Sequence, residues 1–375
     1  MLGWEYPPHV TGGLAAATAG IVEGLVARGI TVDLVLPTAT GVAPLRGLTI
    51  HDLGFGTAPG AYARVLDFGL GLFAAVAQYA ERAVRLVESL TFDVIHAHDW
   101  LTTPAAMRIA SASGRPWVLH VHATEFDRAG EHGHPEIEAV EREGVRGADA
   151  VIAVSRYTRD LVVRRYGADP ASTQVVHNSI ACEGRWVSDV DEEDDWRPLV
   201  LFLGRLTFQK GPDYFVEAAA LVAAERPDVL FVIAGEGDMR AQLMARVAAL
   251  GIGRSVLFTG FVSPDDAQRL YSSADLYVMP SVSEPFGITA LEALAAGTPV
   301  ILSKGAGVRE VVKNALEVDF WDVRALASRI LDTLAYPTLR RELGRRGNAD
   351  LDRWTWEDAA ERAAGIYALL PRARA

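Results

Sequence analysis

The sequence predicts an α/β protein made of two doubly wound domains, each with a parallel sheet. Short β-branched runs alternate with longer Ala-, Leu- and Arg-rich segments of helical period along most of the 375 residues. Strands that alternate with helices form parallel sheets with right-handed crossovers. The alternation stops at an acidic stretch, Ser188–Arg197, and then begins again. A run of like charges beside a proline indicates a solvated linker, and the chain length suits two domains.

The expected strands lie in two blocks, one on each side of this linker. Those of the first block are Val32–Leu36, Asp93–Ala97, Trp117–Val121, Ala150–Val154 and Gln174–Val176. Those of the second block are Leu199–Leu203, Val229–Ala234, Val256–Thr259, Leu276–Met279 and Pro299–Leu302. Helices are expected between them, for example over Ala61–Ser89 and Arg156–Tyr166. Ligands of such sheets bind beyond the carboxyl ends of the strands, so residues just after strands are the candidate site residues.

Composition and charge exclude several classes of function. A net charge of −12 argues against nucleic acid and against an anionic membrane surface as partners. The single cysteine, Cys182, excludes an internal disulfide and a cysteine-rich metal site. The start lacks the pattern of a signal peptide, and the longest apolar stretch, Leu70–Ala77, is far below the ~20 residues that span a bilayer. We therefore expect a cytoplasmic protein without a membrane span, while the oligomeric state stays unknown.

A glycine pair follows two prolines near the start, in the segment GWEYPPHVTGGLA. Gly12 and Gly13 permit a tight turn, and an Ala-rich helix follows them. Backbone amides at the start of a helix, with no side chain in the way, form an anion site. The pair therefore indicates either a phosphate site or a simple turn.

Two cations lie on the loop that follows the expected strand Leu199–Leu203. Arg205 and Lys210 stand five positions apart in GRLTFQKG, just before a helix expected near Pro212. Arginine offers a planar fork for phosphate oxygens, whereas lysine acts as a point charge. The loop is not a Walker loop, since it lacks Gly-Lys-Ser/Thr. Because the chain has only three lysines, a bound anion is favoured over a pair of surface cations.

Two carboxylates stand eight positions apart in EPFGITALE, after the strand that ends at Met279. The proline and glycine after Glu284 delay the next helix, so Glu284 should lie on a loop and Glu292 about two turns into that helix. One carboxylate can then face a reacting sugar and the other a ribose. The amides expected to point at phosphate or sugar hydroxyls are those of Phe286, Gly287 and Ile288. The alternative is a helix-terminal acid beside a solvated glutamate.

All nine histidines lie in the first half, so the second domain has none for acid–base chemistry. His96 and His98 end one expected strand, and His120 and His122 end the next. A period of two puts each pair on one face of its strand, and the strand ends put them at the cleft. Two such pairs could ligate a metal, but no Cys/His ligand spacing is present, and no metal site is expected.

The sequence resembles the family 4 retaining glycosyltransferases of the GT-B fold, especially their glycogen-synthase-like branch. The likeness runs through GWEYPPHVTGGLA, HAHDW, VLHVHATEFDR, VIAVSRYT, VVHNS, GRLTFQKGPDYF, AGEGD, EPFGITALEALAAGTPV and WTWEDAAERA. The Arg–Lys loop combined with the spaced glutamates is its strongly specific part, and the glycine pair is loosely specific. The resemblance implies two Rossmann-like domains facing across a cleft. Residues 1–185 would form the acceptor-side domain, 196–350 the nucleotide-sugar-binding domain, and 351–375 a C-terminal helix packing back on the first domain.

The family's site residues carry over position by position. Arg205 and Lys210 match the pair that holds the donor diphosphate, Glu284 the acid facing the transferred sugar, and Glu292 the one bonding the ribose. His122 matches the histidine beside the anomeric carbon. The implied catalytic residues are Glu284, His122, Arg205 and Lys210. The implied donor-binding residues are Gly12, Gly13, Arg205, Lys210, Phe286, Gly287, Ile288 and Glu292. The part of the cleft near sugar and acceptor would be lined by Asp99, Trp100 and His120.

The implied reaction transfers a sugar from a nucleoside diphosphate with retention of configuration. ADP-glucose or UDP-glucose is the expected donor, an α-glucan or a small molecule the acceptor, and no cofactor or metal is obligatory. Negative charge develops on the leaving phosphate, and preorganised cations stabilise it most in the transition state. No side-chain base is evident, so the leaving phosphate is expected to take the acceptor's proton.

Three alternatives stay open. A transferase of the same fold could make a disaccharide or decorate a surface polysaccharide. A nucleotide-sugar epimerase would need acid–base groups around the sugar, and the histidine-free second domain counts against it. A non-catalytic nucleotide-sugar-binding remnant is suggested by the first strand, because only Met1-Leu2 precede Gly3 where the family has several apolar residues. So short a strand would weaken the N-terminal sheet and anchor the Gly12-Gly13 loop poorly.

Overall fold

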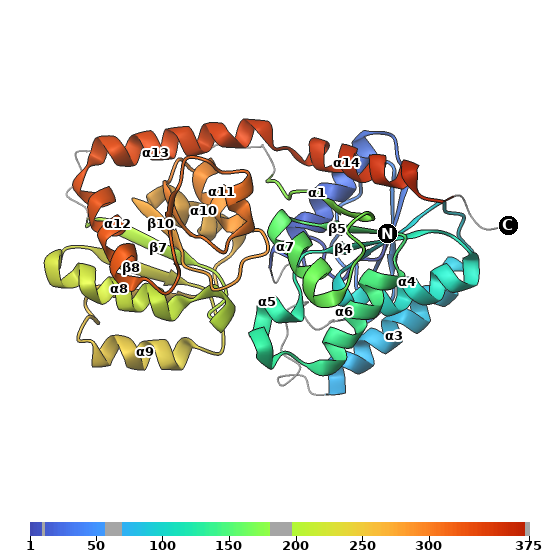
Figure 1. Cartoon of the computed structure of the whole chain (residues 1–375), viewed down its shortest axis with the longest axis horizontal. Helices are drawn as coiled ribbons and strands as arrows, with labels where there is room; N and C mark the ends of the chain where they lie inside the picture. The colour runs from blue at the N-terminus through green and yellow to red at the C-terminus, as the bar shows by residue number, and fades with distance from the viewer. Residues whose placement is uncertain (10–11, 57–69, 181–196, 372–375) are drawn as a thin grey trace. The chain divides into compact units, whose positions relative to one another are not determined.

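The computed structural model describes residues 1–9, 12–56, 70–180 and 197–371, and Figure 1 shows the course of the chain. The chain divides into two compact units, each with its own parallel sheet. Unit 1 comprises Met1–Phe126, Gly130–Ala181 and Trp354–Ala375, and unit 2 comprises Asp127–Ala129 and Cys182–Arg353. The expected linker Ser188–Arg197 lies outside the described residues except for Arg197.

The sheet of unit 1 is parallel throughout its named strands. These are β1 (Val32–Leu36), β2 (Leu48–Asp52), β3 (Ile95–His98), β4 (Trp117–Val121), β5 (Ala150–Ala153) and β6 (Thr173–Val175). β1 pairs with β2, and β3 to β6 pair in sequence order. Every residue of β3, β4 and β5 is buried, as expected for strands covered by helices on both faces.

The first three residues join the two parts of this sheet. Leu2 forms parallel bridges with both Val35 and Ala97. Its N–H donates to the carbonyl of His96 at 2.7 Å, and the N–H of Gly3 donates to the carbonyl of Val35 at 3.0 Å. Leu2 is 2 % exposed and belongs to the core of unit 1. The segment is thus hydrogen-bonded to β1 on one side and to β3 on the other, but only through isolated bridges, as expected for so short a strand, and the weakening of the sheet stays a prediction.

Helices cover both faces of the unit 1 sheet. α1 (Gly13–Ala27) and α14 (Trp356–Leu369) lie on one face, and α3 (Leu70–Val87), α4 (Asp99–Ser113) and α6 (Pro135–Gly147) lie on the other (Figure 1). The shorter α5 (Glu125–Ala129) and α7 (Arg156–Leu161) follow β4 and β5, and a π-helical turn, Val162–Tyr166, continues α7.

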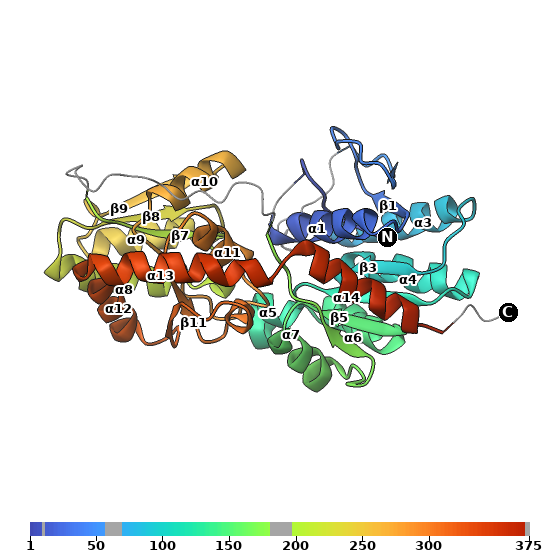
Figure 2. The same cartoon turned by 90° about the horizontal axis from the view of Figure 1, so that it is seen from above.

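Close contact between α1 and α14 ties the last helix to unit 1. Figure 2 shows the two helices side by side. A Cβ atom added to Gly20 would lie 2.1 Å from Cδ2 of Trp356, so only glycine admits the tryptophan ring at that position. A capping box made by Thr355 and Asp358 starts α14 immediately before this contact.

Unit 2 has one six-stranded parallel sheet. Its strands are β7 (Leu199–Leu203), β8 (Leu230–Ala234), β9 (Val256–Gly260), β10 (Leu276–Met279), β11 (Val300–Ser303) and β12 (Leu316–Val318). Their order is β9-β8-β7-β10-β11-β12. The chain starts at β7, moves outward to β9, and returns to β10 on the other side of β7. This reversal is the topological switch point of a Rossmann-like sheet, where ligands bind beyond the strand ends.

Helices cover both faces of this sheet as well. α8 (Pro212–Glu225), α9 (Arg240–Ala249) and α12 (Val323–Ala335) lie on one face, and α10 (Pro264–Ser273), α11 (Ile288–Ala295) and α13 (Pro337–Asp350) on the other (Figure 1). Proline is the first residue of α6, α8, α10 and α13. It fits there because its fixed φ suits a helix and the N–H it lacks would have no helical partner.

Most expected elements are confirmed, with ends that shift by a residue or two. The expected helix Ala61–Ser89 is described only over Leu70–Val87, and its start lies outside the described residues. Two strands, β2 and β12, were not anticipated. Both lie at sheet edges, where β2 has no buried residue and β12 has only three residues, so neither carries a long apolar run.

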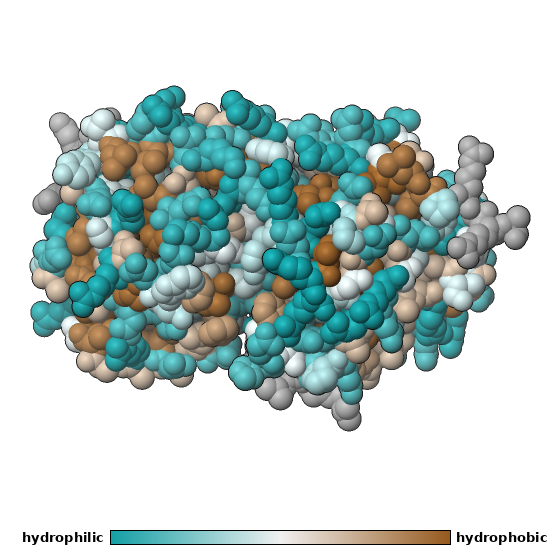
Figure 3. All heavy atoms as spheres, viewed as in Figure 1, coloured by the Kyte–Doolittle hydropathy of each residue, from teal (hydrophilic) through white to brown (hydrophobic). Residues whose placement is uncertain are grey.

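On the face drawn in Figure 3, hydrophilic side chains cover most of the surface and hydrophobic ones are scattered among them. Among the described helices, none combines the length and the apolar character needed to cross a bilayer.

Candidate active site

Two loops flank the switch point of unit 2 and carry most of the residues that the sequence singled out. One follows β7 and contains Arg205 and Lys210, and the other follows β10 and contains Glu284. The N–H of Val282 in the second loop donates to the carbonyl of Gln209 in the first at 2.9 Å. This backbone bond holds the two loops together at the carboxyl edge of the sheet.

A buried glutamine in the first loop accepts a hydrogen bond from Arg205. A guanidinium nitrogen of Arg205 donates to Oε1 of Gln209 at 3.3 Å, and Gln209 is 4 % exposed. A short 3-10 turn, Phe208–Lys210, ends at Gly211, where α8 begins. The loop therefore orients a planar guanidinium and an ammonium from one side of the switch point.

Lys210 and Glu284 form an ion pair, with Nζ 2.5 Å from Oε2. The hydroxyl of Ser281 donates to the same carboxylate oxygen at 3.1 Å. The backbone of Glu284 is held as well, because its N–H donates to the carbonyl of Gly305 and its carbonyl accepts from the N–H of Gly307. Glu284 lies on a loop, as expected, and its side chain is 6 % exposed. Lys210 and Glu284, which are 74 residues apart in the sequence, therefore form one charged site.

The start of α11 lies beside this pair. Gly287, its N-cap, has a φ of 111°, and a Cβ added there would lie 2.8 Å from Cε of Met279. Phe286 is buried, and its carbonyl accepts from the N–H of Val308 at 2.7 Å. Among the described residues no side chain caps α11, and anion binding by the amides at Gly287 and Ile288 stays a prediction.

Glu292 lies in α11, just over one turn from its start at Ile288. The sequence placed it two turns in, which is wrong because the helix begins later than was assumed. The hydroxyl of Tyr271 donates to Oε2 of Glu292 at 2.9 Å. Burial raises the pKa of Glu292 above its usual 4.5, and the Tyr271 hydrogen bond partly offsets this rise.

Gln209, Ser281 and Tyr271 support the charged residues, although the sequence analysis did not single them out. Gln209 and Ser281 lie within or beside the motifs, so their position next to Lys210 and Glu284 was a usable signal. Tyr271 lies on α10, and only the packing of α10 against α11 brings it to Glu292.

In unit 1, Gly12 and Gly13 start α1. Gly12 is the N-cap, with an extended backbone and no side-chain cap, and Gly13 is the first helical residue and exposed. The first turn of α1 holds no acidic residue. Phosphate binding at this helix start stays a prediction.

The four-histidine cluster, which we define as His96, His98, His120 and His122, fills one face of β3 and β4. His98 is the register partner of His120, and neighbouring rings stack or tilt against each other at centroid distances of 4.2–5.4 Å. His96 Nε2 lies 3.2 Å from His120 Nδ1, and His98 Nδ1 lies 2.8 Å from His122 Nε2. His96 Nδ1 also lies 2.5 Å from the hydroxyl of Tyr367 on α14.

Burial keeps these imidazoles neutral. His96, His98 and His120 are 0–2 % exposed, and His122 is 7 % exposed. Burial and the neighbouring imidazoles lower the pKa of His96, His98 and His120 well below 6.5, and burial lowers the pKa of His122 to about 3. At neutral pH the cluster therefore offers lone pairs and N–H groups rather than positive charge.

The HAHDW segment continues from β3 into α4. Asp99 has a φ of 55°, and its Oδ1 accepts from the N–H groups of His122 at 2.7 Å and Ala123 at 3.3 Å. Trp100 is 3 % exposed and packs against Phe73 in the core of unit 1. Asp99 thus fixes the end of β4 and Trp100 contributes to the core. Sugar or acceptor binding by Asp99, Trp100 and His120 stays a prediction.

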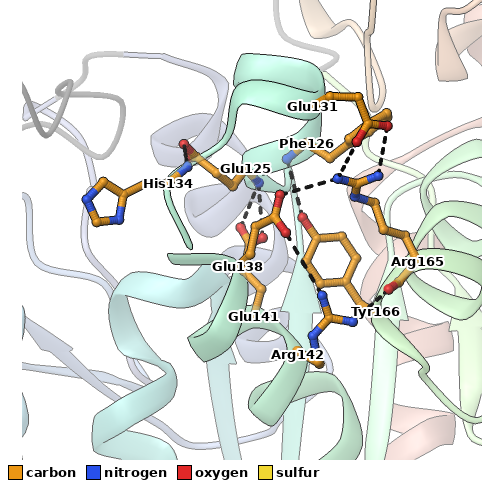
Figure 4. A network of polar contacts seen from close by, with 9 residues as sticks. All are labelled: Glu125, Phe126, Glu131, His134, Glu138, Glu141, Arg142, Arg165 and Tyr166. Atoms are coloured by element: carbon orange, nitrogen blue, oxygen red, sulfur yellow. Dashed lines mark hydrogen bonds and ion pairs between the residues drawn. The ribbon is translucent and has the colours of Figure 1, made fainter. Parts of the chain in front are cut away.

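A polar network anchors the chain after β4, as Figure 4 shows. The N–H of Glu125 donates to both carboxylate oxygens of Glu141, at 2.8 and 3.1 Å. Oε1 of Glu125 accepts from the N–H of His134, and the N–H of Phe126 donates to the hydroxyl of Tyr166. The network fixes the segment that leaves the histidine cluster.

Comparison with known families covers both halves of the chain. The family described as "Glycosyl transferases group 1" matches residues 188–350. The family described as "Glycosyl transferase 4-like domain" matches residues 12–179. The first match contains both loops of the charged site in unit 2, and the second contains the glycine pair and the histidine cluster.

Relatives match over nearly their full length. An uncharacterised glycosyltransferase of Methanocaldococcus jannaschii is 31% identical, over 98% of this chain and 97% of its own. A glycogen synthase of Mycobacterium tuberculosis is 29% identical, over 98% and 93%. Two solved structures show the same fold. Sucrose-phosphate synthase from Thermosynechococcus elongatus has a TM-score of 0.79 at 24% identity, covering 98% of this chain and 94% of its own. HepE of Anabaena, solved with UDP-glucose, has a TM-score of 0.73 at 18% identity, covering 98% and 99%.

Proposed function

Because the chain belongs to the family 4 glycosyltransferases, with the GT-B fold and glycogen-synthase-like relatives, we propose that it transfers a hexose, with retention, from a nucleoside diphosphate sugar. Glucose is the proposed sugar and ADP-glucose or UDP-glucose the donor. A glycan or small molecule is the acceptor, and no metal is obligatory. The observation that carries the proposal is the Lys210–Glu284 ion pair at the switch point of unit 2.

The charges at this site suit a departing nucleoside diphosphate. Arg205 and Lys210 would hold the diphosphate, and the amides at the start of α11 would add two further donors. As the bond from C1 of the sugar to the phosphate oxygen breaks, negative charge grows on that oxygen. Arg205, oriented by Gln209, and Lys210, beside Glu284, would stabilise this charge.

The two carboxylates of the second loop and α11 have separate proposed tasks. Glu284 would face the transferred sugar, and Glu292 would accept hydrogen bonds from the ribose hydroxyls. His122 is proposed to act at the sugar as a neutral imidazole, since its pKa of about 3 keeps it uncharged. The acceptor's proton would pass to the leaving phosphate.

A panel of nucleotide sugars tests the proposal. The chain is mixed with ADP-, UDP- and GDP-glucose and with maltooligosaccharide, and nucleotide release is measured together with product length. We expect release with at least one donor and an α-linked product, whose anomeric configuration NMR reads directly. A β-linked product would contradict retention, and the absence of release with every donor, alongside tight nucleotide binding, would favour the non-catalytic alternative.

The same assay distinguishes α-glucan synthesis from disaccharide formation. Elongation of a labelled maltooligosaccharide supports α-glucan synthesis, as in the relatives named glycogen synthase. A product of only two sugars supports the disaccharide-forming alternative, because the acceptor would then be a single sugar.

A further inference from the structure

The four-histidine cluster holds more ligating groups than the proposed transfer uses. His122 has a proposed task at the sugar and His120 a predicted one in the cleft, whereas His96 and His98 have none. His96, His98 and His120 are buried and come from neighbouring strands, two of them two positions apart on β3 and the third at the register partner of His98 on β4. This arrangement directs three imidazoles to one region on the same face of a rigid sheet.

Several ring nitrogens of the cluster are buried and have no hydrogen-bond partner among the residues that the structure describes. They are Nε2 of His98, Nε2 of His120 and Nδ1 of His122. A buried polar atom without a partner destabilises the folded state, so a native protein normally provides one. Of these atoms, Nε2 of His98 is the one that an ion bound to His96 Nε2 and His120 Nδ1 would supply with a partner.

The distances between the rings suit a tetrahedral metal ion. One ring nitrogen from each of His96, His98 and His120 can be chosen so that the three lie within 4.8 Å of one another. His96 Nε2 and His120 Nδ1 are 3.2 Å apart, close to the about 3.3 Å that separates two ligands bound at 2.0–2.1 Å to one tetrahedral zinc ion. The His98 ring, stacked on those of His96 and His120 at interplanar angles of 15° and 26°, would have to turn out of this stack to direct a nitrogen at the same ion.

Outer partners orient these rings as they do in metal sites. His96 has the Tyr367 hydroxyl at Nδ1, and His98 has His122 at Nδ1. Metal-binding histidines almost always use their second nitrogen in this way, which fixes the ring and leaves the other nitrogen for the ion.

We propose that His96, His98 and His120 bind one divalent transition metal ion of the zinc class, through one ring nitrogen each. Imidazole suits such ions, and its neutral form is the one that ligates them. Binding requires a change of tautomer but no net release of a proton. The ion would hold the carboxyl ends of β3 and β4 together and is structural, so the inference does not depend on the proposed transfer.

The test uses the full chain, stripped of metal with a chelator. Zn²⁺ is titrated in by calorimetry, and Co²⁺ by visible absorption, which reports tetrahedral coordination. We expect one ion per chain, and we expect His98→Gln and His120→Gln each to weaken binding at least hundredfold. His51→Gln is the matched control, because His51 is a strand histidine of the same unit that pairs with Asp33. It should bind as the unaltered chain does.

Two results would overturn the proposal. One is the absence of stoichiometric Zn²⁺ binding, and the other is equal binding by the cluster variants and the control. If circular dichroism shows that the cluster variants do not fold, X-ray absorption at the zinc edge of the unaltered chain decides. Three nitrogen neighbours at about 2.0 Å support the site, and a shell of oxygen alone contradicts it.

Discussion

Nζ of Lys210 lies 2.5 Å from Oε2 of Glu284, across the two loops that flank the switch point of unit 2. The side chains are 22 % and 6 % exposed, so the ammonium reaches solvent while the carboxylate is nearly enclosed. A bound diphosphate would compete with Glu284 for this ammonium. Changes to either residue should therefore separate nucleotide binding from transfer.

Lys210→Met removes the ammonium and keeps most of the side-chain volume. We expect kcat to fall by about 10²–10³-fold, because one preorganised donor to the developing charge is lost. Nucleotide release at saturating donor measures the effect. Lys313→Met, on an exposed lysine of the same unit, is the control and should keep full activity. A Lys210→Met rate within threefold of the unaltered rate would remove Lys210 from the site.

Glu284→Gln should abolish transfer and yet tighten binding of free UDP or ADP. The neutral amide no longer competes for the Lys210 ammonium, which then faces the phosphates. We expect the nucleotide Kd to fall several-fold by calorimetry. In the double variant with Lys210→Met this gain should vanish, since contacting residues act non-additively. Weaker nucleotide binding by Glu284→Gln alone would show that the carboxylate does not compete.

Glu292→Gln should raise stability at neutral pH. The folded state raises the pKa of Glu292, so its protonated form is favoured there. The protonated carboxyl therefore contributes to the free energy of unfolding. This contribution is fully present below the unfolded pKa, near 4.5, and is lost as the pH rises through the folded pKa. Glutamine stays neutral at every pH, so the variant does not lose this stability. Urea unfolding should therefore show a stability difference at pH 7 that disappears below pH 4.5, and a difference independent of pH would contradict the assignment.

Gly287→Ala should destabilise unit 2 and weaken donor binding. A φ of 111° disfavours alanine, and its Cβ would lie 2.8 Å from Cε of Met279. The cost should be about 1–3 kcal/mol, measured by denaturant unfolding, and the displaced start of α11 should raise the donor Kd. Gly253→Ala meets no atom within 4 Å and has no positive φ, so this control should change neither quantity.

Gly20→Ala should loosen the attachment of α14 to unit 1. The added Cβ would lie 2.1 Å from the Trp356 ring, and moving that ring should cost about 1–3 kcal/mol. Gly365→Ala, in α14 itself, meets open space and should stabilise the helix by up to about 1 kcal/mol. Thermal unfolding compares the two, and equal shifts would exclude the close packing.

The pattern of residues along the chain determined the layout of both units. Apolar runs marked strands buried on both faces, and Pro212 marked the start of α8, because both signals act within a few residues. β2 and β12 were not predicted, because these edge strands form by pairing with a neighbouring strand and carry no long apolar run. The family of the two halves could likewise be inferred from local motifs such as HAHDW in the first half and GRLTFQKG and EPFGITALE in the second.

Only the tertiary structure determined which of the candidate site residues contact one another. The Lys210–Glu284 pair joins positions 74 residues apart, and Tyr271 reaches Glu292 only because α10 packs on α11. The histidine cluster arises from the register of His98 with His120, which no spacing within one strand reveals. Local sequence sets backbone preference and chemical type, whereas distances between side chains depend on strand order and helix packing, which involve the whole chain.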